Sequence, residues 1–257
     1  MSLLHRLDPL NVAVRAEKVM FRSARALGLE GALFPAHADF IRFRDGNSRI
    51  SKSQIGQDLF VLWKLGMKRG GYFVEVGAAS GDELSNTCAL ERQFGWDGIC
   101  AEPGRRWHPR LRQGRRCRID ERCVWSTSGL QLDFMECDVG ELSTVASLAT
   151  SDDLERGQLE AQSYRVDSVS LTDLLVQHGA PSVIDYLSID TEGSELEILA
   201  SHDFGRFTFR VITVEHNRVA GRRSAIARLL RSKGYRREMP SLSRFDDWYV
   251  LTQAPAD

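Results

Sequence analysis

The segment 72–103 constrains the fold of this chain most, because it combines a strand pattern, a glycine turn, a helix pattern and a second strand that ends in an acid. Its first part, Tyr72–Val76, is a short apolar run, which is typical of a buried parallel strand. Gly77 and Gly81 then bracket a turn where a ligand can approach the main chain. The second apolar run ends at Glu102, where an acid can accept from the hydroxyls of a ribose. The segment predicts an α/β domain with a nucleoside-cofactor site.

The glycine spacing and a nearby acid distinguish between nucleoside cofactors. A dinucleotide site needs three spaced glycines, so that the pyrophosphate can rest on a helix N-terminus. This turn has only Gly77 and Gly81, and Glu75 comes just before it. The Glu75 carboxylate would repel a pyrophosphate but would pair with the ammonium of a methionine moiety. The pattern therefore favours S-adenosylmethionine over NAD or ATP, and a glycine turn of purely structural use is the alternative.

Strand and helix patterns alternate along most of the remaining chain, as a doubly wound, mostly parallel sheet requires. We expect further strands at residues 117–125, 183–189, 209–215 and 248–251. We expect helices at residues 58–68, after Pro103, and at 171–178, where Ser170 and Asp173 form a capping box. Residues 129–162 break the alternation with a strand at 130–136 and a polar stretch, so we interpret them as an insertion over the site. Extended structure resumes at 164–169.

The first 47 residues predict a helical extension of a catalytic domain at 48–257. Asp8 and Pro9 are typical of a helix start, and Gly28 of a helix stop. The expected helix has an apolar stripe and a basic face. The stripe comprises Ala13, Ala16, Met20, Ala24 and Leu27, and the basic residues are Arg15, Lys18, Arg22 and Arg25. We expect the stripe to pack on the domain, and contact with a membrane or a partner subunit is the alternative.

Composition is that of a single-domain enzyme. The 257 residues are 42% hydrophobic, enough for one large core, and the net charge of −1 gives no global field that selects nucleic acid. The five cysteines are odd in number and lack C-x-x-C spacing, which argues against a disulfide framework or a zinc site and favours the cytoplasm. The expected partner is a small-molecule or glycan acceptor. The sequence leaves open whether the chain forms a homo-oligomer.

Acidic residues follow two of the expected strands. Asp190 ends the strand at 183–189, and Glu215 and His216 end the one at 209–215. Neighbouring strands would bring these side chains about 5 Å apart. Methyl transfer to a hydroxyl needs in-line geometry and a base, for which we expect Asp190 or His216. Alternatively, Asp190, Glu192 and Glu215 gather a divalent cation such as Mg²⁺ or Mn²⁺, which prefers oxygen ligands.

An ordered set of motifs resembles the FkbM-type methyltransferases. The set is SQIGQD (Ser53–Asp58), GGYFVEVGAASG (Gly70–Gly81), SNT (Ser85–Thr87), LERQFGWDGICAEP (Leu90–Pro103), LSIDTEGSELEIL (Leu187–Leu199) and VEHN (Val214–Asn217). The resemblance runs from Gln54 to about Val250. It implies a class I methyltransferase fold, S-adenosylmethionine as cofactor, and O-methylation of a sugar or other small metabolite. Ala79 and Ser80 depart from the family, which often has an aromatic residue or Asp between the glycines.

The residue patterns and the resemblance together define the expected cofactor site. Glu75, Gly77 and Gly81 would hold the methionine end, Glu102 the ribose, and Val124 or Trp125 the adenine. The resemblance implies that Gln54, Gln57 and Asp58 close over the cofactor. The remaining expected contacts are Ala78, Asn86, Thr87 and Pro103.

The predicted function is S-adenosylmethionine-dependent O-methylation of a sugar, glycan precursor or related small metabolite. One alternative is a nucleotide-sugar or NAD-binding enzyme on the same topology. The other is a catalytically inactive methyltransferase-like binding module.

Overall fold

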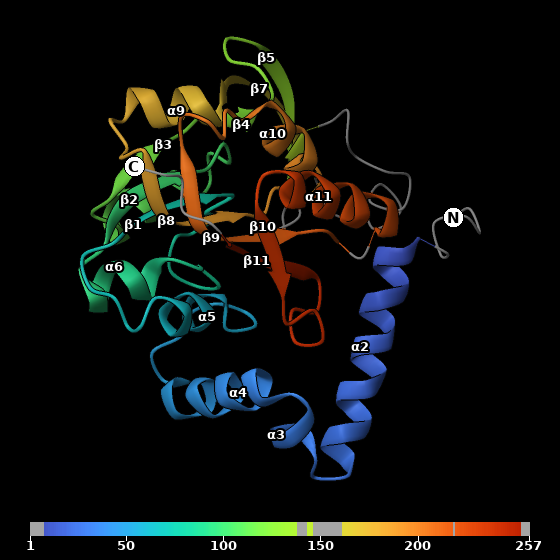
Figure 1. Ribbon diagram of the computed structural model, residues 1–257. Coiled ribbons are helices and arrows are strands. Elements are labelled where there is room, and N and C mark those ends of the chain that lie inside the picture. Colours follow the sequence, from blue (N-terminus) through green and yellow to red (C-terminus); the bar gives the residue numbers. More distant parts are fainter. Residues whose placement is uncertain (1–7, 138–142, 146–160, 218, 253–257) are drawn as a thin grey trace.

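The computed structural model describes residues 8–137, 143–145, 161–217 and 219–252. A seven-stranded sheet forms its centre, in the order β10-β11-β9-β8-β1-β2-β3 (Figure 1). The strands, in that order, are Tyr235–Glu238, Asp246–Leu251, Thr208–Glu215, Val183–Ile189, Tyr72–Val76, Asp97–Ala101 and Arg118–Asp120. All neighbouring pairs are parallel except those of β11, which is antiparallel to both β9 and β10. The predicted class I, doubly wound, mostly parallel sheet of seven strands is confirmed.

The central strands are almost wholly buried because helices cover both faces of the sheet. On one face, the apolar side chains of α9 (Leu171–Gln177), α10 (Glu195–Ser201) and α11 (Ala220–Ser232) pack against the sheet. On the other, those of α5 (Gln57–Lys64), α6 (Cys88–Phe94) and α7 (His108–Gly114) do the same. This two-sided burial explains why β1, β8 and β9 have continuous apolar runs instead of alternating ones.

The strand register determines which side chains meet at the edge of the sheet. Val76 of β1 pairs with Ala101 of β2 and with Ile189 of β8, and Ile189 pairs in turn with Val214 of β9. The next residues along these four strands are therefore neighbours at the carboxyl edge. They are Gly77, Glu102, Asp190 and Glu215.

The expected strand at 117–125 is wrong as a single element. It divides into β3 and β4 (Cys123–Trp125), which belong to different sheets. The Asp120 carboxylate accepts from the backbone N–H of Arg122 at 3.1 Å, and this turn takes the chain off the sheet edge. β4 begins a second, four-stranded sheet with the order β4-β7-β5-β6. Its other strands are β7 (Ala161–Ser170), β5 (Gln131–Cys137) and β6 (Thr144–Val145).

Two further expectations differ from the structure. Pro103 does not open the helix after β2, because the Gly104 N–H bonds to the Glu102 carboxylate at 2.7 Å and forms a turn; α7 begins at His108 instead. The edge strand β10 was not expected, because its sequence YRRE lacks apolar alternation. Its Arg237 pairs with the buried Asp247 of β11, a contact that the strand pattern does not reveal.

The N-terminal residues form α2 (Pro9–Ala26), α3 (Glu30–Leu33) and α4 (Pro35–Asn47). The expected start of α2 is confirmed, since the Asp8 carboxylate accepts from the Leu10 N–H at 2.9 Å. The expected apolar stripe is buried only at Ala24: Met20 is 56% and Leu27 73% exposed, and the other buried positions are Asn11, Val14 and Phe21. The division into an extension and a catalytic domain stays a prediction.

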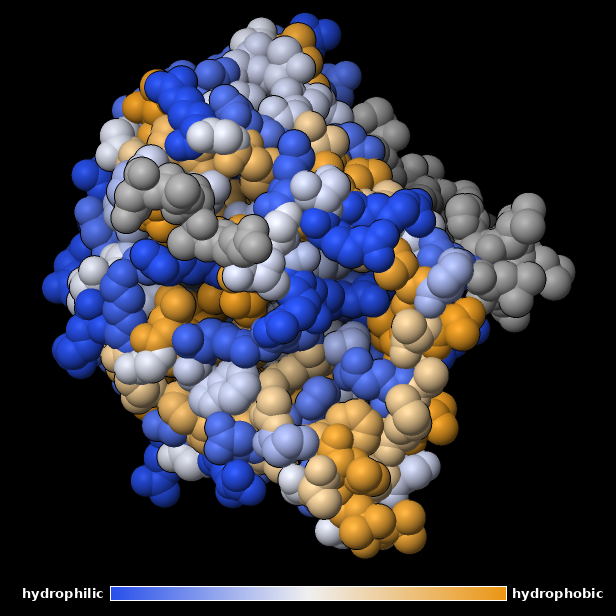
Figure 2. All heavy atoms as spheres, viewed as in Figure 1, coloured by the Kyte–Doolittle hydropathy of each residue, from blue (hydrophilic) through white to orange (hydrophobic). Residues whose placement is uncertain are grey.

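Tertiary contacts choose the buried face of α2. Asn11 bonds to Ser224 of α11 at 2.8 Å, and Phe21 packs edge-on against Phe34 with ring centroids 5.4 Å apart. The helix reaches away from the sheet, so its other faces meet solvent (Figure 1). Hydrophobic residues gather on the surface over this lower part of the molecule (Figure 2). None of the helices described is long and apolar enough to cross a bilayer.

Candidate active site

A cleft of about 260 Å³ lies at the carboxyl ends of β1, β2, β8 and β9. Parallel α/β sheets bind ligands at this edge, because the strand ends and the following turns leave a crevice there. Most of the predicted site residues line the cleft. They are Gln54, Gln57, Glu75, Gly77, Ala78, Asn86, Glu102, Pro103, Val124, Asp190, Glu192 and Glu215.

The two glycines of the turn after β1 have different roles. Gly77 has a φ of 82°, and a Cβ there would lie 1.7 Å from the carbonyl oxygen of Asp190. Only glycine fits this close crossing of the β1 and β8 ends. Gly81 is not part of the cleft wall; a Cβ there would lie 2.5 Å from Leu111 of α7. Gly77 thus shapes the cleft, and Gly81 allows α7 to pack.

Glu102 presents a buried carboxylate to the cleft. Its Oε2 accepts from the backbone N–H of Ala79 at 2.8 Å, and its Oε1 from that of Gly104 at 2.7 Å. Burial raises the pKa of Glu102 to about 7, although the two N–H groups oppose the shift. Each oxygen keeps a further lone pair, so the carboxylate can still accept from a ligand hydroxyl. This geometry suits the ribose role predicted for Glu102.

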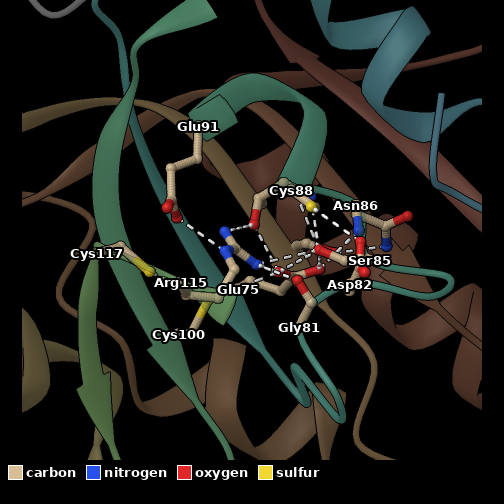
Figure 3. A network of polar contacts seen from close by, with 12 residues as sticks. Glu75, Gly81, Asp82, Ser85, Asn86, Cys88, Glu91, Cys100, Arg115 and Cys117 are labelled. Atoms are coloured by element: carbon tan, nitrogen blue, oxygen red, sulfur yellow. Dashed lines mark hydrogen bonds and ion pairs between the residues drawn. The ribbon is translucent and has the colours of Figure 1, made fainter. Parts of the chain in front are cut away.

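Glu75 lies at the centre of a buried hydrogen-bond network (Figure 3). Its carboxylate accepts from the backbone N–H of Asn86 at 2.7 Å and from the hydroxyls of Ser85 and Thr87. The Arg115 guanidinium lies 3.3 Å from the same carboxylate. Glu75 therefore lines the cleft with its charge already offset by an arginine.

Arg115 was not singled out by the sequence, where it is one of several arginines on and after α7. In the structure it is 5% exposed, and it donates to Glu91 at 2.8 Å and to the carbonyl oxygen of Gly81 at 3.0 Å. Burial opposes the ionisation of Glu91, but the Arg115 charge and hydrogen bond outweigh it and lower the pKa of that carboxyl. Arg115 thereby connects the glycine turn, β1 and α6.

Three carboxylates converge at the ends of β8 and β9. One oxygen from each of Asp190, Glu192 and Glu215 lies within 4.8 Å of the others. Burial, followed by the charge of Asp190, raises the pKa of Glu215 well above its usual range, and burial raises that of Asp190. Two carboxylates this close do not both ionise without a cation. Glu215 Oε2 has no hydrogen-bond partner among the described residues, so the cluster can take a proton or a metal ion.

Several non-glycine residues with a positive φ lie around the same cleft, whereas Met67, Met239 and Arg244 lie elsewhere. Ala79, Glu192 and Asn217 have φ values of 44°, 54° and 47°, in a region that non-glycine residues rarely adopt. Such residues cost about 1–3 kcal/mol each and cluster at functional sites. Asn217 donates to the Glu192 carboxylate at 2.8 Å, which fixes the orientation of that acid. The strain thus supports a functional role for the turns after β1, β8 and β9.

The second sheet supplies part of the cleft wall. Val124 lines the cleft as predicted for the adenine side, and Cys123, Phe134 and Val145 lie beside it. Trp107, from the segment before α7, also lines the cleft. The region interpreted as an insertion over the site therefore contributes side chains to it. Phe134 was missed because nothing in the pattern of a separate short strand indicates where that strand folds back.

Five predicted site residues do not line the cleft: Asp58, Gly81, Thr87, Trp125 and His216. Asp58 instead accepts from the hydroxyls of Ser51 and Ser53, which secures the loop before Gln54. His216 faces another hollow, and its Nε2 lies 3.1 Å from the carbonyl oxygen of Asp246. Burial lowers the pKa of His216 to about 4. Asp190 and Glu215 therefore stay as the candidate bases of the cleft.

The chain is similar to known proteins in sequence and in structure. The sequence model of the methyltransferase FkbM domain matches residues 75–237. A search of curated proteins found no match. Among solved structures, the chain is similar to a precorrin-6y C5,15-methyltransferase from Geobacter metallireducens GS-15, with 15% identity, a TM-score of 0.38, and 70% of this chain and 71% of that chain covered. It is also similar to a proposed RNA methyltransferase from Pyrococcus horikoshii, with 12% identity, a TM-score of 0.36, and coverage of 72% and 67%.

Proposed function

The chain belongs to the FkbM methyltransferase family, and we propose that this S-adenosylmethionine-dependent enzyme methylates a hydroxyl of a sugar, glycan precursor or related small metabolite. The observation that carries the proposal is the carboxylate cluster of Asp190, Glu192 and Glu215 beside the cleft. A hydroxyl is a weak nucleophile, so its methylation benefits from a base that takes the proton as the oxygen attacks.

The cofactor would lie along the cleft with its polar groups toward the strand ends. Glu102 would accept from the ribose hydroxyls, and Val124, with Phe134 and Val145, would contact the adenine. The methionine end would lie over the Gly77 turn, beside Glu75, whose carboxylate is already paired with Arg115. This placement directs the methyl group toward Asp190 and Glu215. Gln54 and Gln57 would close the cleft from the side of α5.

In this arrangement bound S-adenosylmethionine would supply an activated methyl group for the acceptor oxygen and would leave as S-adenosylhomocysteine. The cleft residues would hold the acceptor hydroxyl in line with that group, and a carboxylate of the cluster would take the hydroxyl proton. Asp190 and Glu215 are suited to this task because carboxyls with raised pKa values are stronger bases. Their proximity disfavours ionisation of both carboxyls at once, so the pair can share one proton. The enzyme mainly positions the reactants, since the methyl donor is already activated.

A divalent cation is the second candidate for the cluster. Asp190, Glu192 and Glu215 would provide three oxygen ligands of the kind that Mg²⁺ or Mn²⁺ prefers. The unpartnered Glu215 Oε2 fits such a role. A bound cation would lower the pKa of the acceptor hydroxyl. The protein side chains would then fix the position of the hydroxyl.

Calorimetric titrations separate the proposal from its rivals. We expect S-adenosylhomocysteine to bind, and NAD and UDP-glucose not to bind. A panel of sugar acceptors with labelled S-adenosylmethionine then tests transfer, with excess chelator or added Mg²⁺ in parallel reactions. Binding of NAD in place of S-adenosylhomocysteine would contradict the cofactor. Binding without transfer to any hydroxyl in the panel would favour the binding module. Full turnover in excess chelator would exclude a role for a metal ion in the reaction.

A further inference from the structure

A second hollow, of about 560 Å³, lies between α2, α11 and the loop from β10 to β11. Five cationic side chains line it: Arg15, Lys18 and Arg22 of α2, Arg223 of α11, and Arg244 of the loop. The three α2 residues are three and four positions apart, so they share one face of the helix. Cationic side chains from three parts of the chain therefore meet at the hollow.

The exposed charges of Arg15, Arg22 and Arg244 are not balanced by acids that line the hollow. No acidic side chain lines the hollow in the described parts of the chain. Arg223 is held by Asp247 at 2.8 Å, whereas Arg15, Arg22 and Arg244 make no ion pair with a described residue. The whole protein has a net charge of only −1, so this concentration of cations is local. Their mutual repulsion would be relieved by a multivalent anion.

Buried polar groups line the hollow together with the exposed arginines. Asn11, His216 and Arg223 line it, and all three are less than 10% exposed. The planar guanidinium group of arginine can donate two parallel hydrogen bonds to a phosphate. The ammonium group of lysine cannot form this paired contact, so arginine binds phosphate with more defined geometry. We propose that this hollow binds the phosphate or pyrophosphate group of an anionic ligand.

The hollow adjoins the active-site cleft at the end of β9. Glu215 lines the cleft, and the next residue, His216, lines the hollow. Asp246 joins the two regions: its carboxylate accepts from Gln57 of the cleft at 2.8 Å, and its carbonyl oxygen lies 3.1 Å from His216 Nε2. A sugar phosphate or sugar diphosphate ester is therefore the class of acceptor that suits both regions, an assignment that rests on the proposed function.

Titration with inorganic pyrophosphate tests the hollow without requiring catalysis. The proteins are the wild type, the double variant Arg15→Gln/Arg22→Gln, and the control Arg25→Gln, all saturated with S-adenosylhomocysteine. Glutamine is a good helix former, so α2 should persist, and circular dichroism checks this. We expect the double variant to bind pyrophosphate at least about tenfold more weakly, because it loses charge-assisted hydrogen bonds. Arg25 lies one turn beyond the hollow, so its variant should bind like the wild type.

Several outcomes would overturn the proposal. They are the absence of pyrophosphate binding to the wild type, and an equal loss in Arg25→Gln, which would indicate a diffuse surface charge. Sedimentation with phosphatidylglycerol vesicles, together with no binding of pyrophosphate, would assign the arginines to a lipid surface instead. S-adenosylhomocysteine titration of the same proteins reports on the cleft alone. Failure of the proposed function would therefore be seen separately from failure of the hollow.

Discussion

At the scale of single residues, Glu102 is the predicted contact for the cofactor ribose. Replacing it with alanine removes the acceptor of the Ala79 and Gly104 N–H groups and the acceptor that we propose for the ribose hydroxyls. We expect Glu102→Ala to weaken S-adenosylhomocysteine binding by about 1.5–3 kcal/mol, the range for hydrogen bonds to a charged group. Calorimetry on the folded variant measures this. Glu121→Ala, outside the cleft, is the control, and equal affinity in both variants would refute the ribose assignment.

Asp190 is the residue on which the proposed chemistry depends most. Asp190→Asn keeps the size of the side chain but removes its basicity, and it also removes one of the three carboxylates. We expect cofactor binding to persist and methyl transfer to fall by at least about 10²-fold, as for a removed general base. Labelled cofactor with the acceptor panel measures the rate. Glu197→Gln, an exposed position on α10, should keep its activity. A wild-type rate in Asp190→Asn would show that the active centre is not at this cluster.

At the scale of elements, Arg115 holds β1, α6 and the glycine turn together through two buried carboxylates. Arg115→Met would leave Glu75 and Glu91 buried without their cation. We expect a loss of about 3–5 kcal/mol in the free energy of unfolding, because a buried charge that loses its partner is strongly destabilising. Arg116→Met is the matched control: its side chain is 80% exposed, so the change should stay below about 1 kcal/mol. Urea denaturation compares the two, and similar losses would contradict this role of Arg115.

At the scale of the whole molecule, the acidic cluster should make stability depend on pH. Burial and Asp190 raise the pKa of Glu215 in the folded state above its ordinary value of 4.5. Between these two pKa values the folded chain binds the proton more tightly than the unfolded chain does. The free energy of unfolding should therefore fall as the pH rises above about 4.5.

Glu215→Gln removes this titration, so we expect a flatter dependence of stability on pH. The variant should exceed the wild type at pH 9 by at least about 1 kcal/mol, since one pKa unit corresponds to about 1.36 kcal/mol. Urea denaturation at pH 5, 7 and 9, without divalent cations, provides the comparison. Parallel curves for the two proteins would show that Glu215 does not titrate differently on folding.

Local patterns in the sequence were sufficient for the central strands of the sheet and for most of the cleft. A buried parallel strand has a continuous apolar run, so β1, β2, β8 and β9 were predicted with nearly their observed bounds. Parallel strands end at a common edge, and Asp190 and Glu215 were therefore expected to lie close together, as they do in the cleft wall. The glycine spacing and Glu75 then favoured S-adenosylmethionine as the cofactor.

Only the tertiary structure decided which partners each side chain meets. Arg115 and Glu75 are 40 positions apart, and no local period connects them. His216 follows Glu215 directly, yet it faces the cationic hollow instead of the cleft. The buried face of α2 depends on contacts with α11 and α3–α4, so its apolar stripe did not predict it. The central strands and the edge where they end could be predicted from the sequence, because they follow from local hydrophobic patterns. Packing decided the contacts between distant segments, because a pairwise contact leaves no periodic trace in the chain.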